Sequence, residues 1–163
     1  MNRITVAVEG YAHTLPPWTV AIDRYLITVL DRLGKHNWDL SIVFCTDSSM
    51  RELNRQFRGK DEATDVLSFP CGETIEEEGE ERYIPGDIVI SLETLAVNAV
   101  YFKVDQNEEL RRLLIHGVLH LDGMDHAGTS ASEPMLQIQE HILAALAPLT
   151  MMPELPLASE VRL

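Results

Sequence analysis

At 163 residues, of which 45% are hydrophobic, the chain is long enough for one globular domain with a sizeable core. Its 13 basic and 26 acidic side chains give a formal net charge of −13, which disfavours a surface that binds nucleic acid through its overall charge. The N-terminal residues do not resemble a secretion signal, and no apolar run approaches the roughly 20 residues of a membrane helix. We therefore expect a cytoplasmic protein with no membrane partner.

The spacing of apolar residues predicts alternating strands and helices, followed by a run of helices. In chain order we expect a strand at 3–9, a helix at 16–34, a strand at 39–46, a helix at 48–58, strands at 64–69 and 86–91, and helices at 93–103, 106–122 and 131–147. Residues 1–150 form one predicted domain, and 151–163 form a predicted irregular tail. Cys45 and Cys71 form no CxxC pair, which favours buried, reduced thiols.

Charge is distributed unevenly along the chain. Six glutamates crowd residues 73–82, a segment with almost no apolar content, which indicates a solvated acidic loop between the third and fourth strands. Conversely, four of the 13 cations fall within ten residues, at Arg51, Arg55, Arg58 and Lys60. The overall negative charge therefore coexists with a predicted local basic patch.

The segment HGVLHLDGMDH, residues 116–126, contains three of the six histidines. It lies at the end of the helix predicted at 106–122, where Asp105 and Glu108 form a capping-box-like start. Apolar residues go all the way round this helix, so we expect it to be buried.

Within this segment, His116 and His120 are four residues apart and share one helical face. Gly123 is predicted to end the helix, and the turn then brings His126 back towards that face. Three imidazoles around a tetrahedral ion with one open position are the arrangement of a catalytic zinc site. We therefore predict one zinc ion per chain at His116, His120 and His126, although nickel, copper and iron also accept nitrogen ligands.

The spacing HxxxHxxGxxH also matches the metzincin peptidases, whose motif carries a glutamate directly after the first histidine. Gly117 occupies that position here, so the carboxylate that would act as general base is absent. Gly117 indicates either close helix packing or a need for room beside the metal, and both interpretations disfavour a peptidase. The other histidines, His13, His36 and His141, are isolated and are predicted to be surface or capping residues.

The helix predicted at 48–58 carries two stripes of side chains. Arg51, Arg55 and Arg58 form one, which is expected to be exposed. The other is expected to pack and consists of Met50, Leu53 and Phe57. Arg51 and Arg55 fit an ordinary solvated face as well as a phosphate-binding one. Arg58 precedes a glycine at the helix C-terminus, where the helix dipole favours a cation and from which it can project into a cleft.

Together these motifs resemble the YbeY family of bacterial metal-dependent endoribonucleases. The matching segments are LNRQFRGKDEATDVLSFP (53–70), GDIVIS (86–91), HGVLHLDGMDH (116–126) and MLQIQEHIL (135–143). The resemblance implies a single small α+β domain, in which a mixed sheet of about four strands is covered by helices and a zincin-like metal helix packs on the sheet.

For function, the resemblance implies a hydrolase that cuts single-stranded RNA. Its partner would be the ribosome or a small-subunit precursor, in 16S rRNA 3′ end maturation and ribosome quality control. It also implies zinc at His116, His120 and His126, and a functional role for Arg58. The general base stays open, because Asp65 and Asp125 are candidates only by residue type.

Two rival functions use the same histidines. A zinc metallopeptidase would need a carboxylate base from elsewhere in the chain. A non-catalytic ribosome-assembly factor would hold the metal as a structural clip, with a fourth ligand supplied by the protein.

Overall fold

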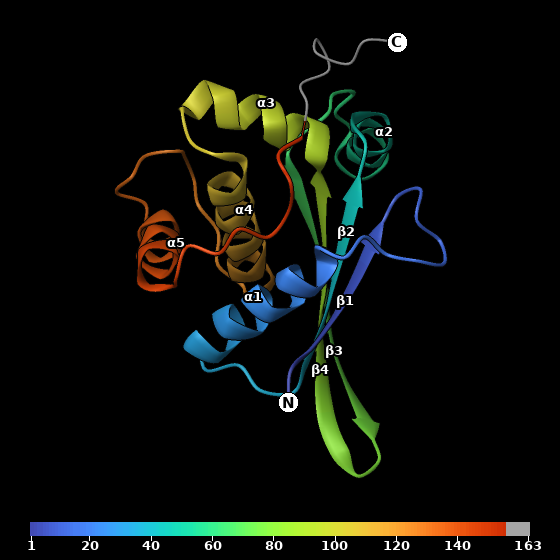
Figure 1. Ribbon diagram of the computed structural model, residues 1–163. Coiled ribbons are helices and arrows are strands. Elements are labelled where there is room, and N and C mark those ends of the chain that lie inside the picture. The colour runs from blue at the N-terminus through green and yellow to red at the C-terminus, as the bar shows by residue number, and fades with distance from the viewer. Residues whose placement is uncertain (156–163) are drawn as a thin grey trace.

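Four strands form one mixed sheet at the centre of the computed structural model, which describes residues 1–155 (Figure 1). Their order across the sheet is β1-β2-β4-β3. The strands are β1 (Arg3–Val8), β2 (Trp38–Cys45), β3 (Val66–Glu77) and β4 (Glu80–Ser91). β1, β2 and β4 run parallel, whereas β3 pairs antiparallel with β4 and forms one edge. The predicted α+β domain with a mixed four-stranded sheet is confirmed.

Helices cover both faces of this sheet. They are α1 (Thr19–Arg32), α2 (Asp47–Arg58), α3 (Leu92–Phe102), α4 (Gln106–Leu121) and α5 (Pro134–Ala145). In Figure 1, α1 and α4 lie against one face, α5 lies outside α4, and α2 lies across the sheet from them. Each lies within a few residues of its predicted position.

The alternation of side chains along β4 explains the two layers. Ile88 and Ile90 are fully buried in the main core, which β4 shares with α1 and α4. Val89 points to the opposite face and packs with Met50 of α2 in a smaller cluster. A strand that is apolar at consecutive positions therefore has helices on both sides, as parallel sheets usually do.

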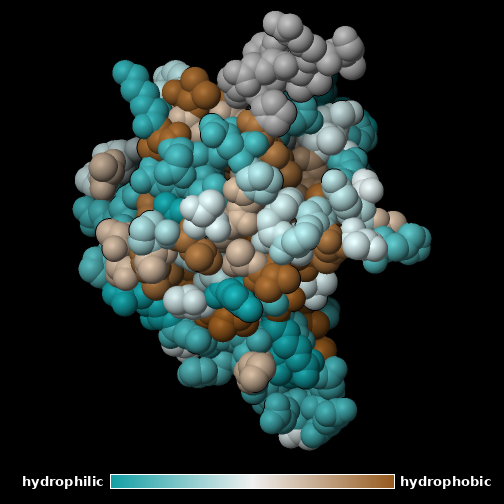
Figure 2. Space-filling model, viewed as in Figure 1, coloured by the Kyte–Doolittle hydropathy of each residue, from teal (hydrophilic) through white to brown (hydrophobic). Residues whose placement is uncertain are grey.

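The acidic segment 73–82 is not a loop, contrary to the sequence prediction. β3 and β4 continue through it as a hairpin, with Glu77 paired to Glu80 across a turn at Glu78 and Gly79. Both turn residues have positive φ, 52° and 79°, which suits the twist of a two-residue hairpin connection. The ladder of backbone hydrogen bonds continues despite the repulsion between glutamates. Figure 2 shows this end of the hairpin as a largely hydrophilic projection.

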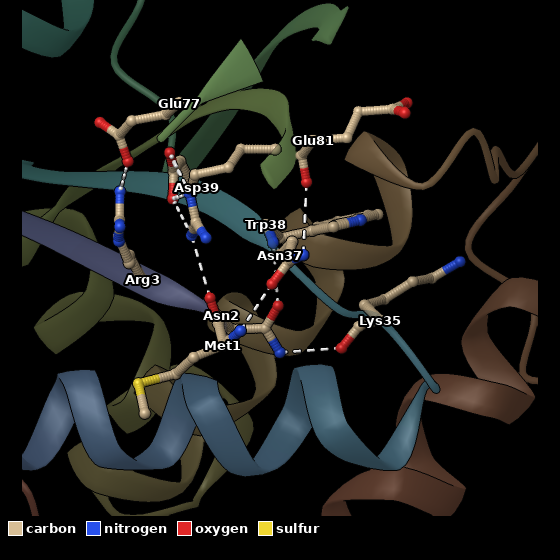
Figure 3. A network of polar contacts seen from close by, with 10 residues as sticks. Met1, Asn2, Arg3, Lys35, Asn37, Trp38, Asp39, Glu77 and Glu81 are labelled. Atoms are coloured by element: carbon tan, nitrogen blue, oxygen red, sulfur yellow. Dashed lines mark hydrogen bonds and ion pairs between the residues drawn. The ribbon is translucent and has the colours of Figure 1, made fainter. Parts of the chain in front are cut away.

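The hairpin is tied to the start of the chain by a polar network (Figure 3). Arg82 of β4 is buried, and its Nε lies 3.0 Å from both carboxylate oxygens of Asp39 on β2. The same guanidinium donates to the carbonyl oxygen of Met1 at 2.9 Å. Arg3 pairs with Glu77 farther along the hairpin. The hydrogen bond from Arg82 lowers the pKa of Asp39, so this buried cation keeps an ionised partner.

Residues 146–155 have no helix or strand, yet Met151 and Met152 are buried in the main core. The side chain of Asn107 on α4 accepts from the backbone nitrogens of both methionines, at 2.7 and 3.1 Å. Gln106 forms a two-way pair with the backbone of Leu155. This segment therefore packs along the helix that carries two of the histidines. The rest of the predicted tail, 156–163, lies outside the described residues.

Both cysteines are free, but only one is buried as predicted. Burial raises the pKa of Cys45 to about 11, which leaves its thiol protonated. Cys71 is exposed, as are all residues of β3 from Pro70 to Glu77, and it lies where the register of β3 against β4 shifts. Among the described residues, no helix combines the length and apolar character that crossing a bilayer requires.

Candidate metal centre

His116 and His120 extend from one face of α4. Asp105 caps this helix by accepting a hydrogen bond from the backbone nitrogen of Glu108 at 2.8 Å, as the capping pattern predicts. Most of the helix is buried, including apolar residues on several of its faces. Both histidines are half-buried, so α4 presents them from a rigid core element.

The chain reverses directly after α4 and returns His126 to the same place. The helix ends at Leu121, and Gly123 has a φ of 90°, the left-handed conformation that glycine adopts readily. The ring centroids of the three histidines lie 4.6 to 5.5 Å apart. One nitrogen of each lies within 4.8 Å of the others, close enough to hold one metal ion. The predicted convergence of His116, His120 and His126 is present.

Each histidine directs its Nδ1 to an oxygen that can only accept a hydrogen bond. His116 donates to Gln139 Oε1 at 2.7 Å and His120 to the carbonyl oxygen of Met124 at 3.0 Å. His126 donates to the carbonyl oxygen of Gly128 at 2.6 Å. With a proton on every Nδ1, every Nε2 presents a lone pair. The Nε2 atoms of His116 and His120 are 3.1 Å apart. Converging lone pairs of this kind fit a metal ion.

The surroundings also favour the neutral imidazole, which is the form that binds metal. Burial lowers the pKa of His116, and its histidine neighbours act in the same direction. Burial is likewise the main cause of the lowered pKa of His120. Fewer protons therefore compete for these nitrogens near neutral pH.

Of the two interpretations of Gly117, the structure supports close packing of α4 on the sheet. A β-carbon at this position would lie 2.7 to 2.9 Å from three side-chain atoms of Ile88 on β4. Atoms at that separation overlap, so the glycine lets α4 approach the sheet closely. The position where metzincins carry their glutamate therefore faces the sheet core, with no space for a carboxylate.

We expect Gly117→Ala to lower the free energy of unfolding by about 1–2 kcal/mol, because overpacking costs up to about 3 kcal/mol and alanine recovers only about 1 kcal/mol of helix propensity. Urea denaturation of wild type and variant measures the difference. Gly128→Ala is the control, since the nearest atom to a β-carbon there is 4.0 Å away. A Gly117→Ala protein as stable as wild type would contradict the packing interpretation.

A cleft of about 620 Å³ opens beside the histidine cluster. One wall is the edge strand β3, and the other is the end of α4 with its following turn. Its lining comprises Arg58, Asp65, Val66, Leu67, Ser68, Pro70, His116, His120, Gly123, Met124, Asp125 and His126. The four residues singled out from the sequence, Arg58 and the three histidines, therefore share one cavity.

Arg58 reaches this cleft from the C-terminal end of α2. Gly59 ends the helix in the left-handed conformation, with its nitrogen donating to the carbonyl oxygen of Arg55 at 3.1 Å. Among the described residues, no carboxylate forms an ion pair with Arg58. Its guanidinium is thus available to an anion that enters the cleft.

Two of the four cations in the predicted basic patch, Arg51 and Arg55, are paired with carboxylates. Arg51 makes two hydrogen bonds to Asp61, at 2.8 and 3.0 Å, and Arg55 pairs with Glu52. Because both pairs are exposed, they stabilise the fold little, yet they occupy the donors that phosphate would need. For Arg51 and Arg55, the solvated-face interpretation fits the structure.

Phe57 differs from its predicted packed position, since it is 60% exposed and touches Phe69 only at an edge-to-face ring distance of 5.2 Å. Met50 is buried and Leu53 packs against the same small cluster, so Phe57 is the one member of the predicted packing stripe that lies exposed.

Asp65 and Asp125 both line the cleft but differ in their attachments. Asp65 accepts hydrogen bonds from the backbone nitrogen of Val66 at 2.8 Å and from Asn98 at 3.2 Å, which brace the start of β3. Asp125 accepts from the backbone nitrogen of His126 and lies 3.9 Å from His120 Nδ1, too far for a hydrogen bond. Neither arrangement singles out one carboxylate as the base.

Sequence reasoning missed Gln139, the acceptor for His116. It is 5% exposed and sits between Met135 and Ile142 on the buried stripe of α5. An amide at helical spacing among core residues is the signal that could have identified it.

A cluster of three histidines that could hold a metal ion therefore lies on a helix packed against a mixed four-stranded sheet. Residues 15–147 match the family model described as Endoribonuclease YbeY. The chain belongs to the YbeY family.

Relatives named Endoribonuclease YbeY align with most of the chain. The Endoribonuclease YbeY of Treponema pallidum is 46% identical over 145 residues, 88% of this chain and 89% of its own. That of Treponema denticola is 50% identical over 125 residues, covering 76% and 81%. Among solved structures, the solution structure of TM1509 from Thermotoga maritima matches with a TM-score of 0.58 and 28% identity, over 86% of each chain.

Proposed function

We propose that this protein is a metal-dependent endoribonuclease that cuts single-stranded RNA, with one zinc ion held by His116, His120 and His126. The observation that carries the proposal is one cleft in which three imidazole lone pairs converge near Arg58, an arginine with no ion-pair partner within residues 1–155. The relatives' name supplies the reaction class. The family resemblance extends the proposal to 16S rRNA 3′ end maturation and ribosome quality control in the cytoplasm, with the ribosome or a small-subunit precursor as partner.

The three histidines bind the metal, and Arg58 binds the phosphate. A bound metal ion supplies Lewis acidity towards water and towards a phosphoryl oxygen. The carbonyl partners at each Nδ1 hold the imidazoles in the ligand tautomer. Arg58 offers its planar fork of donors to the scissile phosphate and offsets the negative charge that develops during cleavage.

The rival functions fit this geometry less well. A peptidase of the metzincin kind lacks its glutamate, because Gly117 packs against Ile88. A structural clip needs a fourth protein ligand, and the metal-binding group found among residues 1–155 contains three histidines alone. Cys45 belongs to the α2-side cluster and Cys71 to the hairpin, so neither thiol lines the cleft.

A paired substrate assay tests the proposal. Wild type and His116→Ala are incubated with single-stranded RNA, with the matching duplex, and with casein. We expect metal-dependent cleavage of single strands by the wild type alone, and intact casein throughout. A duplex should be cut poorly, because its paired strands cannot bend into the cleft as a single strand can.

The assay must also allow for weak binding. The net charge is −13, and Arg51 and Arg55 are already paired, so few phosphate contacts are available to free RNA. Small-subunit precursors therefore serve as a second substrate. Peptide cleavage without RNA cleavage would overturn the nuclease, and neither activity, even with ribosomal particles, would favour the assembly factor.

A further inference from the structure

The histidine cluster has three Nδ1 acceptors, and only one of them is a side chain. Met124 and Gly128 accept through backbone carbonyls, which no substitution removes. The acceptor for His116 is the amide of Gln139, which comes from α5, a helix outside α4. The orientation of His116 therefore depends on a contact between two helices.

α5 is well placed to hold this contact. Arg112 of α4 donates to Glu140 of α5 at 2.7 Å, which ties the helices together one residue from Gln139. The amide nitrogen of Gln139 faces Glu140 Oε1 at 3.5 Å, so its oxygen is the atom turned to His116. At 5% exposure the amide has little freedom to turn over. Were it reversed, its nitrogen would donate to Nδ1 and leave the proton on Nε2, where a metal ion must bind.

The acceptor for His116 is also electrically neutral. Metal-binding histidines often donate to a carboxylate, which makes the imidazole a stronger ligand but adds a negative charge beside the ion. Here an amide and two carbonyls take that place, and among the described residues no carboxylate accepts from the three rings within hydrogen-bond distance. A divalent ion held this way keeps its full charge, which attracts an anionic substrate.

We propose that Gln139 is a positioning residue with two effects: it fixes His116 in its metal-facing tautomer, and as a neutral acceptor it preserves the positive charge that draws phosphate into the cleft. The proposal rests on the proposed metal centre and deepens it. It explains why a buried amide occupies the apolar stripe of α5, where a hydrophobic residue would pack at no polar cost.

The test compares Gln139→Met, which removes the acceptor at similar length, with Gln139→Glu, which keeps an acceptor and adds charge. Zinc affinity is measured by competition with a chromophoric chelator, and the affinity of the zinc-loaded protein for inorganic phosphate by calorimetry. We expect Gln139→Met to lose zinc affinity by about ten- to hundredfold. Gln139→Glu should bind zinc at least as tightly as wild type and phosphate several-fold more weakly.

Gln137→Glu is the matched control, because it places the same charge on an exposed position of the same helix. It should change neither affinity. The nitrogen spectrum of His116 in metal-free protein adds a signature that packing alone would not move: a proton on Nδ1 in wild type and a mixture of tautomers in Gln139→Met.

If both Gln139 variants lose zinc and stability together while the His116 tautomer is unchanged, Gln139 is only a packing residue and the proposal fails. Unweakened phosphate binding by Gln139→Glu overturns the charge effect even if Gln139→Met does not fold. RNA is absent from these measurements, so a wild type that binds zinc but cuts no RNA overturns the proposed nuclease and leaves this result standing.

Discussion

His120→Ala is expected to reduce bound metal from about one ion per chain to nearly none. Of the three proposed ligands, His120 stands one helical turn from His116 and contacts it Nε2 to Nε2 at 3.1 Å. Two remaining imidazoles cannot enclose a tetrahedral ion. Metal analysis of the purified proteins after gel filtration gives the content directly, and RNA cleavage should be lost with the metal.

The stability of this variant separates a metal effect from a folding effect. Binding to the native state raises the free energy of unfolding, so chelation should lower the melting temperature of wild type. The same treatment should leave His120→Ala unchanged. Without metal the two proteins should have similar melting temperatures, because His120→Ala also removes the close approach of the Nε2 lone pairs of His116 and His120. His141→Ala, an exposed position on α5, is the control and should behave as wild type. Full metal content in His120→Ala would contradict the proposed ligand set.

The parts of the site that follow local rules could be predicted from the sequence. Helical periodicity places His116 and His120 on one face, and the glycine conformation at Gly123 reverses the chain. These rules act within a few residues, so no knowledge of the fold is needed. The mixed sheet followed from the strand patterns and the family resemblance.

Other features depend on contacts between distant segments and escaped prediction. The composition of the acidic segment predicts a loop. Glu76 and Glu77 nevertheless continue strand β3, because β4 supplies hydrogen-bond partners for the backbone. The pairing of Arg51 with Asp61 depends on the turn at Gly59. Gln139 lies 23 residues from His116 and meets it only when α5 packs on α4. Composition reports the charge of a segment but not the partners that the fold provides.

Arg58→Ala is expected to lower RNA cleavage by about a hundredfold or more while metal content stays at the wild-type level. Removing one preorganised donor to a developing negative charge has an effect of about this size. Arg58 lines the cleft beside the histidines but is not one of the proposed metal ligands, so the metal centre should persist. Arg58→Lys should recover little, because a single ammonium cannot reproduce the two parallel hydrogen bonds of a guanidinium. Single-turnover cleavage of a labelled single strand at saturating enzyme measures the chemical step.

The matched control is Arg55→Ala, one helical turn earlier on α2 with its guanidinium engaged by Glu52. It removes the same charge from the same helix and should retain nearly full cleavage, since an exposed ion pair contributes about 0–1 kcal/mol and no substrate contact. Equal losses in both variants would mean that general charge, not position, matters. Full activity in Arg58→Ala would leave the residue as a cation placed at a helix C-terminus by the helix dipole, worth about 0.3–1 kcal/mol of stability and nothing to catalysis.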